Sequence, residues 1–156
     1  MIKTAKDFKG YWIKNLVNFK GHEGEPLFQC TVYKDGKKIG FFSEDSHGGP
    51  ARFDGIERKY EEQLNKDAQE FSGSDYVEEY HSFICKIAEA VDTVKYLRKH
   101  CKKKALFYLR GDAVGSYRTM KAPWKGNESK IEEYLSEKYG DGGYTIINKS
   151  LESLGV

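Results

Sequence analysis

The sequence predicts an α+β domain with a mostly antiparallel sheet and helices packed on one of its faces. Candidate strands cluster toward both ends of the chain and two helical segments lie between them, in the order βββ-αα-ββ-α-β. A chain of 156 residues is long enough to build a hydrophobic core. We therefore expect one domain over residues 1–156, with a division into two subdomains near residue 103 as the alternative.

The first strands are predicted by alternation and by one turn. Residues 11–19 read as a strand, and residues 27–43 read as a hairpin around Asp35-Gly36. This dipeptide favours a two-residue type I′ turn, because both central positions of that turn need positive φ. The strands that flank it should therefore be antiparallel neighbours.

A two-residue turn also predicts the register of the hairpin. Counting outward from the turn puts Val32 opposite Ile39 and Cys30 opposite Phe41. These four side chains would form the apolar face. Phe42 would then lie on the opposite, mostly polar face.

Two helices are expected after the hairpin. Asp54 and Glu57 have the spacing of a capping box, and an apolar stripe follows them as far as Gly73. Ser74 is placed to cap a second helix, whose apolar residues recur at steps of three and four up to its basic end at Lys104. Acidic residues near the start and basic residues near the end suit the helix dipole.

The remaining elements lie in the last third of the chain. Residues 104–110 and 116–123 read as a second hairpin around the loop "GDAVG". Asn127 is placed to cap a third helix that Gly140 ends, and residues 144–148 read as a last strand.

Charge is distributed unevenly along the chain. Residues 44–92 hold 5 Lys/Arg and 13 Asp/Glu, whereas residues 93–130 hold 11 and 2. Basic groups attract phosphates, and interleaved aromatic rings can stack on bases. We therefore predict a binding surface for nucleic acid, or for an acidic patch of a protein, over residues 95–125. A solvated helix end followed by an ordinary hairpin is the alternative. The predicted binding residues are Lys95, Arg98, Lys99, Lys102, Lys103, Lys104, Arg110, Arg118, Lys121, Trp124 and Lys125.

Two histidine-bearing loops form a second candidate site. "KGHEGEP" contains His22 and "FSEDSHGGPARFD" contains Asp45 and His47. If the first strand pairs with the second, both loops lie at the same sheet edge. A histidine base oriented by Asp45, beside glycines that let backbone approach a phosphate, would suit a small nucleotide- or phosphate-binding protein or enzyme. A simple connection between elements is the alternative.

No strong catalytic or metal motif occurs, which favours a non-enzymatic binding protein. The chain lacks phosphate-loop, nucleophile-elbow and metalloprotease patterns. His81 and Cys85 share a helix face, but no further ligand is spaced to complete a metal site, so we predict neither a metal nor a cofactor. Three cysteines without redox spacing and the lack of a long apolar run favour a cytoplasmic protein with reduced thiols and no membrane partner.

The segment "FKGHEGEPLFQCTVYKDGKKIGFFSEDSHGGPARFD", residues 19–54, resembles the N-terminal part of small uncharacterised proteins of bacteriophages and mobile elements. A glycine- and glutamate-bearing loop, an Asp-Gly hairpin and a Gly-Gly loop follow one another in both. The resemblance implies a phage protein in the host cytoplasm that binds a host protein or nucleoprotein complex, including an inhibitor of host defence. A homo-oligomeric adaptor with a surface rich in Tyr and Phe is a further alternative.

Overall fold

The computed structural model describes residues 2–154. They form two compact units, one of residues 3–91 and one of residues 92–154 with Ile2. The boundary lies within a long helix, α2 (Glu79–Cys101), so each unit contains part of that helix. Helices and antiparallel sheets are both present, which confirms the α+β class. Among the described residues the strands form two sheets, however, and not the single sheet that we expected.

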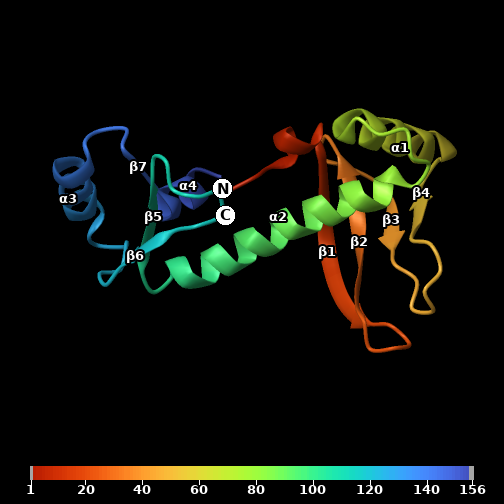
Figure 1. Cartoon of the computed structure of the whole chain (residues 1–156), viewed down its shortest axis with the longest axis horizontal. Helices are drawn as coiled ribbons and strands as arrows, with labels where there is room; N and C mark the ends of the chain where they lie inside the picture. Colours follow the sequence, from red (N-terminus) through yellow and green to blue (C-terminus); the bar gives the residue numbers. More distant parts are fainter. Residues whose placement is uncertain (1, 155–156) are drawn as a thin grey trace. The chain divides into compact units, whose positions relative to one another are not determined.

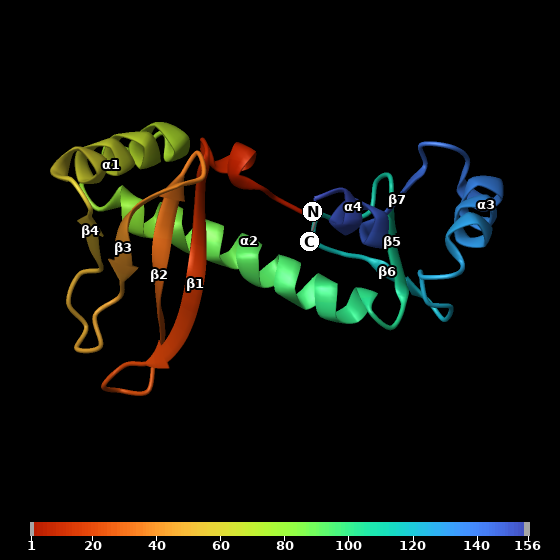
Figure 2. The same cartoon turned by 180° about the vertical axis from the view of Figure 1, so that it is seen from behind.

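The unit of residues 3–91 contains a four-stranded antiparallel sheet in chain order (Figures 1 and 2). A short 3-10 helix, η1 (Ala5–Phe8), precedes the sheet, and helix α1 (Arg58–Ser72) follows it. The strands are β1 (Tyr11–Lys20), β2 (Pro26–Lys34), β3 (Lys37–Ser43) and β4 (Arg52–Gly55).

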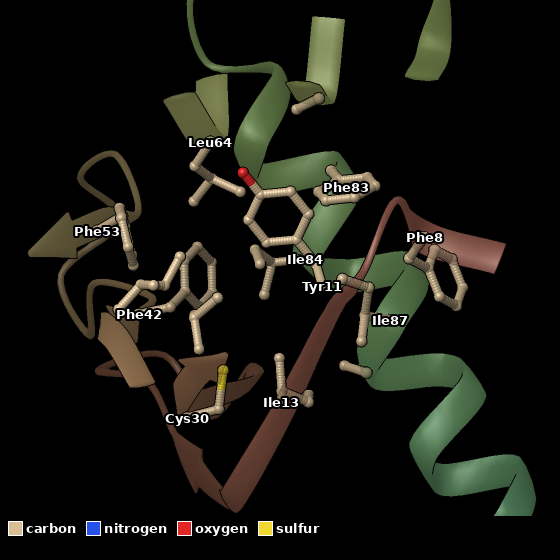
Figure 3. Packing of buried hydrophobic residues seen from close by; sticks show 14 of the residues in the cluster. Phe8, Tyr11, Ile13, Cys30, Phe42, Phe53, Leu64, Phe83, Ile84 and Ile87 are labelled. Carbon is tan, nitrogen blue, oxygen red and sulfur yellow. The ribbon is translucent and has the colours of Figure 1, made fainter. Parts of the chain in front are cut away.

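One hydrophobic core joins this sheet to α1 and to the first half of α2 (Figure 3). The rings of Tyr11 and Phe83 meet edge to face at 5.5 Å, and both are buried. Leu64 reaches the same core from α1. Both helices therefore cover one face of this sheet, as predicted. The fully buried residues include Phe8, Ile13, Phe42, Ile84 and Ile87.

The hairpin turn is confirmed, but the register beyond it is wrong by one residue. Asp35 and Gly36 both have positive φ, 49° and 82°. The pairing then shifts, so that Cys30 lies opposite Phe42 and Ile39 is the extra residue of a bulge. Phe42 consequently points into the core, while Phe41 is 46% exposed.

The predicted capping box is also wrong. Asp54 belongs to strand β4, where it lies opposite Phe41. Helix α1 begins later, with Glu57 at its N-cap and without a side-chain cap. Pairing with β3 satisfies the backbone groups of β4, which outweighs the local preference of Asp54 for a helix start.

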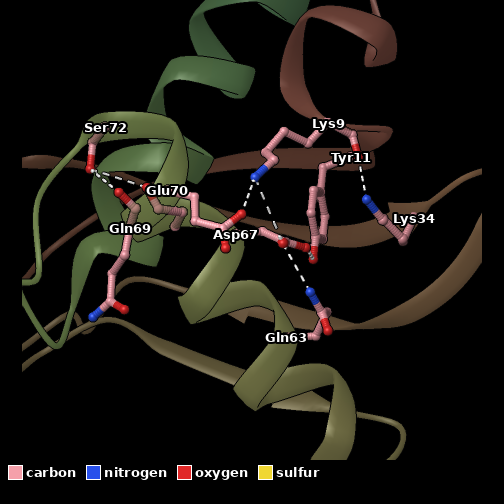
Figure 4. Close-up of polar contacts among 9 residues, drawn as sticks. Lys9, Tyr11, Lys34, Gln63, Asp67, Gln69, Glu70 and Ser72 are labelled. Carbon is pink, nitrogen blue, oxygen red and sulfur yellow. Dashed lines mark hydrogen bonds and ion pairs between the residues drawn. The ribbon is translucent and has the colours of Figure 1, made fainter.

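A polar cluster attaches the start of β1 to helix α1 (Figure 4). Asp67 is buried, and its carboxylate accepts hydrogen bonds from the Tyr11 hydroxyl at 2.7 Å and from the Gln63 amide at 2.9 Å. Lys9 Nζ lies 3.9 Å from the same carboxylate and 2.6 Å from Glu70. Burial, together with the bond to Asp67, raises the pKa of the Tyr11 phenol.

The unit of residues 92–154 is built on a three-stranded antiparallel sheet in the order β6-β5-β7. Its strands are β5 (Ala105–Leu109), β6 (Arg118–Met120) and β7 (Tyr144–Ile146). Its helices are the end of α2, α3 (Glu128–Tyr139) and α4 (Ile147–Ser153). The last strand is shorter than predicted because the chain turns into α4 at Ile147.

Side chains of β5 alternate between two cores in this unit. Phe107 packs with Leu135 of α3, whereas Leu106 packs with Leu97 of α2 and Leu151 of α4. Helices therefore cover both faces of this sheet, which corrects the prediction that helices would cover one face only.

Candidate functional site

The predicted basic surface lies at the end of α2 and in the turn after it. The side chains of Lys95, Arg98, Lys99, Lys102, Lys103 and Lys104 are all exposed. Within residues 2–154, none of these six forms an ion pair. Leu97 is buried on the opposite side of the helix, where it fixes the helix against β5 and α4. The six cations therefore face outward from a rigid support.

An aromatic cluster lies beside these lysines. The ring of Tyr96, which is 53% exposed, lies against the His100 ring with a centroid distance of 4.3 Å and an angle of 51° between the ring planes. Its centroid is 6.4 Å from that of the Tyr117 ring. The Tyr117 hydroxyl donates a hydrogen bond of 3.1 Å to the Tyr96 hydroxyl, and this bond raises the pKa of Tyr117. We call Tyr96, Lys99, His100, Lys103 and Tyr117 the Tyr96 surface.

Two cavities flank the basic end of α2. One, of about 290 Å³, is lined by Lys99, His100, Lys103, Lys104, Leu106 and Thr119. The other, of about 220 Å³, is lined by residues that include Arg98, Cys101, Lys102 and Lys125. Burial raises the pKa of the Cys101 thiol to about 11, so the second cavity contains no reactive thiolate at neutral pH.

The structure removes one predicted binding residue and constrains another. Trp124 is only 4% exposed, and its indole N–H donates to Glu152 at 2.8 Å, so its ring packs in the core and cannot stack on a base. Arg118 forms two hydrogen bonds with Asp112, at 3.0 and 3.1 Å. Arg110 and Lys121 are exposed but line neither cavity.

Sequence reasoning missed Tyr96 and His100 as members of the site. Their four-residue spacing puts them on one face of the predicted helix, between Lys95 and the lysines that follow. This spacing was the available signal. Trp124, the aromatic residue named from the sequence, lies instead between β6 and α3 and is buried.

The two histidine loops meet in the unit of residues 3–91, as predicted. The rings of His22 and His47 stack with centroids 5.4 Å apart, and the His22 backbone N–H donates to the Ser46 carbonyl at 2.6 Å. Asp45 accepts a hydrogen bond from the His47 backbone N–H at 2.9 Å, and the carboxylate lies 3.9 Å from His47 Nδ1. The predicted triad of residues is therefore close together, at an exposed edge.

The charges around this edge do not suit an anion. A cavity of about 440 Å³ there is lined by Glu44, Asp45 and Arg52, among others. Arg52 already donates to Asp54 at 2.7 Å, so the lining presents two carboxylates and one arginine that has a partner. His47 is 75% exposed, which leaves its imidazole in a solvent-like environment.

Helix α2 holds both ends of the 44–51 loop. The Tyr80 hydroxyl donates to the Ala51 carbonyl at 2.7 Å, and His81 Nε2 lies 2.9 Å from a carboxylate oxygen of Glu44. The loop is therefore a well-anchored connection. The structure also brings a carboxylate to His81, which the spacing along the sequence did not indicate.

No protein-family model, curated protein or solved structure matches this chain. Within the described part of the chain, none of the helices combines the length and the apolar character that a membrane span requires.

Proposed function

We propose that the protein is a non-enzymatic binding protein that binds single-stranded nucleic acid through the Tyr96 surface. One observation carries the proposal: the exposed ring of Tyr96, in contact with His100, lies among lysines that have no ion-pair partner among the described residues. Proteins that bind single strands combine the same two elements, aromatic rings for bases and basic groups for the backbone.

The contacts of the Tyr96 ring preorganise it for stacking on a base. His100 supports one side of the ring and the hydroxyl of Tyr117 fixes its far end. Little rotamer freedom is then lost on binding, which favours affinity. Lys99 lies in the last turn of α2 and Lys103 in the turn that follows the helix, and both line the cavity that also contains His100, so they add positive charge beside the ring.

A host nucleoprotein complex would present the same chemistry. The partner implied by the resemblance of residues 19–54 to phage proteins, including a host defence complex, stays a prediction. An acidic protein surface would satisfy the lysines but would leave the exposed Tyr96 ring without a role, so we favour nucleic acid.

Binding of a nucleotide or phosphate metabolite at the His22–His47 edge is a weaker second candidate. The stacked rings and the adjacent cavity support it. The carboxylates of Glu44 and Asp45 in the cavity argue against it, because they would repel a phosphate.

Fluorescence anisotropy with labelled single-stranded DNA and RNA tests the proposal. We expect Tyr96→Ala to weaken binding by roughly tenfold, since one stacked base contributes about 1–3 kcal/mol. Tyr134→Ala is the matched control: Tyr134 is 48% exposed on α3 and lies beside Lys138, away from the Tyr96 surface. No binding of either nucleic acid by the wild type at low salt, or equal losses in the two variants, would refute the proposal.

A further inference from the structure

Three side chains with different metal-binding chemistry converge in the unit of residues 3–91. A carboxylate oxygen of Glu44, an imidazole nitrogen of His81 and the sulfur of Cys85 all lie within 4.8 Å of one another. His81 and Cys85 are four residues apart on α2, so they occupy the same face of the helix. Glu44 follows β3 directly and reaches them from the sheet.

The backbone orients Glu44 toward the other two groups. Its N–H donates to the Phe28 carbonyl at 3.1 Å, and the Phe28 N–H donates to Oε1 of Glu44, also at 3.1 Å. The second carboxylate oxygen is thereby directed to His81 Nε2, 2.9 Å away. A ligand carboxylate held by an outer hydrogen bond is a common feature of metal sites.

The surroundings are partly closed. The buried ring of Phe42 packs beside the His81 ring, with 5.8 Å between centroids. The side chain of Glu44 is 16% exposed and that of His81 is 39% exposed. The three groups are therefore partly screened from solvent, and the His81 side chain is more exposed than that of Glu44.

We propose that Glu44, His81 and Cys85 bind a divalent transition metal of the zinc class, with water as the remaining ligand. Carboxylate, imidazole and thiolate are the three ligand types that Zn²⁺ takes from proteins, and three protein ligands leave one tetrahedral position open. The site contains none of the residues of the Tyr96 surface and does not depend on the proposed function.

A Cys-His-Glu nucleophile would use the same residues, but the arrangement suits it less well. A nucleophilic cysteine needs a positive environment, whereas the Glu44 carboxylate close to the Cys85 sulfur disfavours a free thiolate. A divalent cation between the two groups would compensate both negative charges. The geometry therefore fits a metal better than a reactive thiol.

Titration of the full-length protein with Co²⁺ tests the site directly. A Co²⁺ ion bound by a thiolate gives a strong near-ultraviolet charge-transfer absorption, and Zn²⁺ should displace it. We expect this absorption in the wild type and its loss in Cys85→Ser. Cys101→Ser is the matched control, because Cys101 is another partly buried cysteine on α2 and should leave the absorption unchanged.

A second pair of variants tests the Glu44 ligand without removing the thiol. Glu44→Gln keeps an oxygen for the Phe28 N–H but removes the charge, and we expect it to weaken Co²⁺ binding by at least about tenfold. His47→Ala, which removes one of the two stacked surface imidazoles, should leave the affinity unchanged. Circular dichroism of each variant, recorded in the presence of a chelator, verifies that the variant is folded. If Cys85→Ser does not fold, the result with Glu44→Gln decides whether the proposed site binds the metal.

Three results would overturn the proposal. The first is the absence of the charge-transfer absorption in the wild type, which would leave an ordinary hydrogen bond between His81 and Glu44. The second is an absorption that survives Cys85→Ser, because another thiol would then hold the ion. The third is loss of binding in His47→Ala with retention in Glu44→Gln, which would place the ion at the His22–His47 edge.

Discussion

At the scale of single residues, the buried carboxylate of Asp67 depends on its partners. It is 7% exposed and accepts hydrogen bonds from Tyr11 and Gln63. A buried charge is tolerated only where hydrogen bonds and opposite charge replace water. The aromatic ring of Tyr11 supplies core packing and its hydroxyl supplies one of these bonds.

Tyr11→Phe removes that hydroxyl and keeps the ring. We expect the free energy of unfolding to fall by about 1.5–3 kcal/mol, because the lost hydrogen bond is made to a charged, buried group. Urea denaturation measures this change. Tyr33→Phe is the control, since Tyr33 is partly exposed and its ring contacts Lys14. Equal small losses in both variants would contradict the role given to Asp67.

Asp112 connects the loop after β5 to Arg118, and we expect this connection to weaken in acid. Its hydrogen bond to Arg118, and a further one from the Leu109 backbone N–H, hold the pKa of its carboxyl below the usual range. A lowered pKa means that the stabilisation is fully present above the pKa of the unfolded chain and is lost as pH falls through the folded value. The ordinary pKa of an aspartate, about 3.9, therefore marks the start of the loss.

We accordingly expect amide exchange in residues 110–117 to accelerate as pH falls below the ordinary aspartate range, after correction for the intrinsic pH dependence of exchange. In Asp112→Asn the loop should be loose at every pH, and no such step should appear. A step that persists in Asp112→Asn would assign the sensitivity to another group.

Charge at the proposed binding surface could be predicted residue by residue, but the exposure of its aromatic residues could not. The row of lysines from Lys95 to Lys104 was evident in the sequence, and each is exposed. Trp124 and Tyr96 are both aromatic residues near that row, yet one is in the core and the other on the surface. The difference depends on the packing of α3 and α4, which local sequence does not encode.

At the scale of elements, the first hairpin shows that a turn dipeptide specifies the turn type but not the register of the strands beyond it. The Asp35-Gly36 dipeptide specified the turn type through its backbone preferences. The bulge at Ile39 arises further along, where β3 must pair with β2 on one side and with β4 on the other. The sequence pattern shows no such constraint, because β4 is a short strand without clear alternation.

Gly40 of β3 lies too close to β4 to accommodate a side chain. A Cβ atom at Gly40 would lie 2.5 Å from the backbone oxygen of Asp54 and 2.7 Å from the ring of Phe53. We expect Gly40→Ala to reduce the free energy of unfolding by about 1–3 kcal/mol, because the backbone of β4 must move. Gly21→Ala is the control, because the nearest atoms to its added Cβ belong to the side chain of Glu25. We expect a much smaller loss in its free energy of unfolding, and chemical denaturation measures both variants.

The end of α2 depends on a side chain far along the sequence. Asn148 is 4% exposed, and its amide donates to the carbonyls of Cys101 and Lys104 at 3.2 and 3.0 Å. Its oxygen accepts the Leu106 N–H at 2.7 Å. This one amide therefore joins the helix end, the basic turn and strand β5.

Asn148→Ala leaves those three backbone groups without their partner. We expect a loss of about 2–4 kcal/mol in the free energy of unfolding, since each buried unsatisfied group costs about 1–3 kcal/mol and water recovers part of it. Thermal unfolding followed by circular dichroism measures the change. If Asn148→Ala reduces the free energy of unfolding by less than Lys130→Ala, a replacement at an exposed position, the Asn148 amide is dispensable.

At the scale of the whole molecule, the sequence predicted most of the helices and strands, though not β4, and joined the strands in one sheet. Pairing between strands that are far apart in the sequence is decided by core packing. No pattern in the sequence indicated that β5 pairs only with β6 and β7. The meeting of His22 with His47 could be predicted because a single hairpin carries both loops. The approach of Glu44 to His81 and Cys85 could not, because it depends on how α2 packs on the first sheet.

The charge distribution leads to a last prediction, on salt dependence. Residues 93–130 hold 11 Lys/Arg against 2 Asp/Glu, and binding of a single strand should therefore release counterions from each phosphate contacted. We expect the logarithm of the association constant to fall with the logarithm of salt concentration by about 0.7 per phosphate contact. Lys99→Ala and Lys103→Ala should each reduce that slope by about 0.7, and Lys130→Ala should leave it unchanged.

Tyr96→Ala separates stacking from charge in the same measurement. It should lower affinity at every salt concentration while leaving the slope unchanged, because stacking releases no counterions. A reduced slope in Tyr96→Ala would mean that the ring only positions the lysines. An unchanged affinity, with reduced slopes in the lysine variants, would mean that the surface recognises a polyanion by charge alone and has no preference for exposed bases.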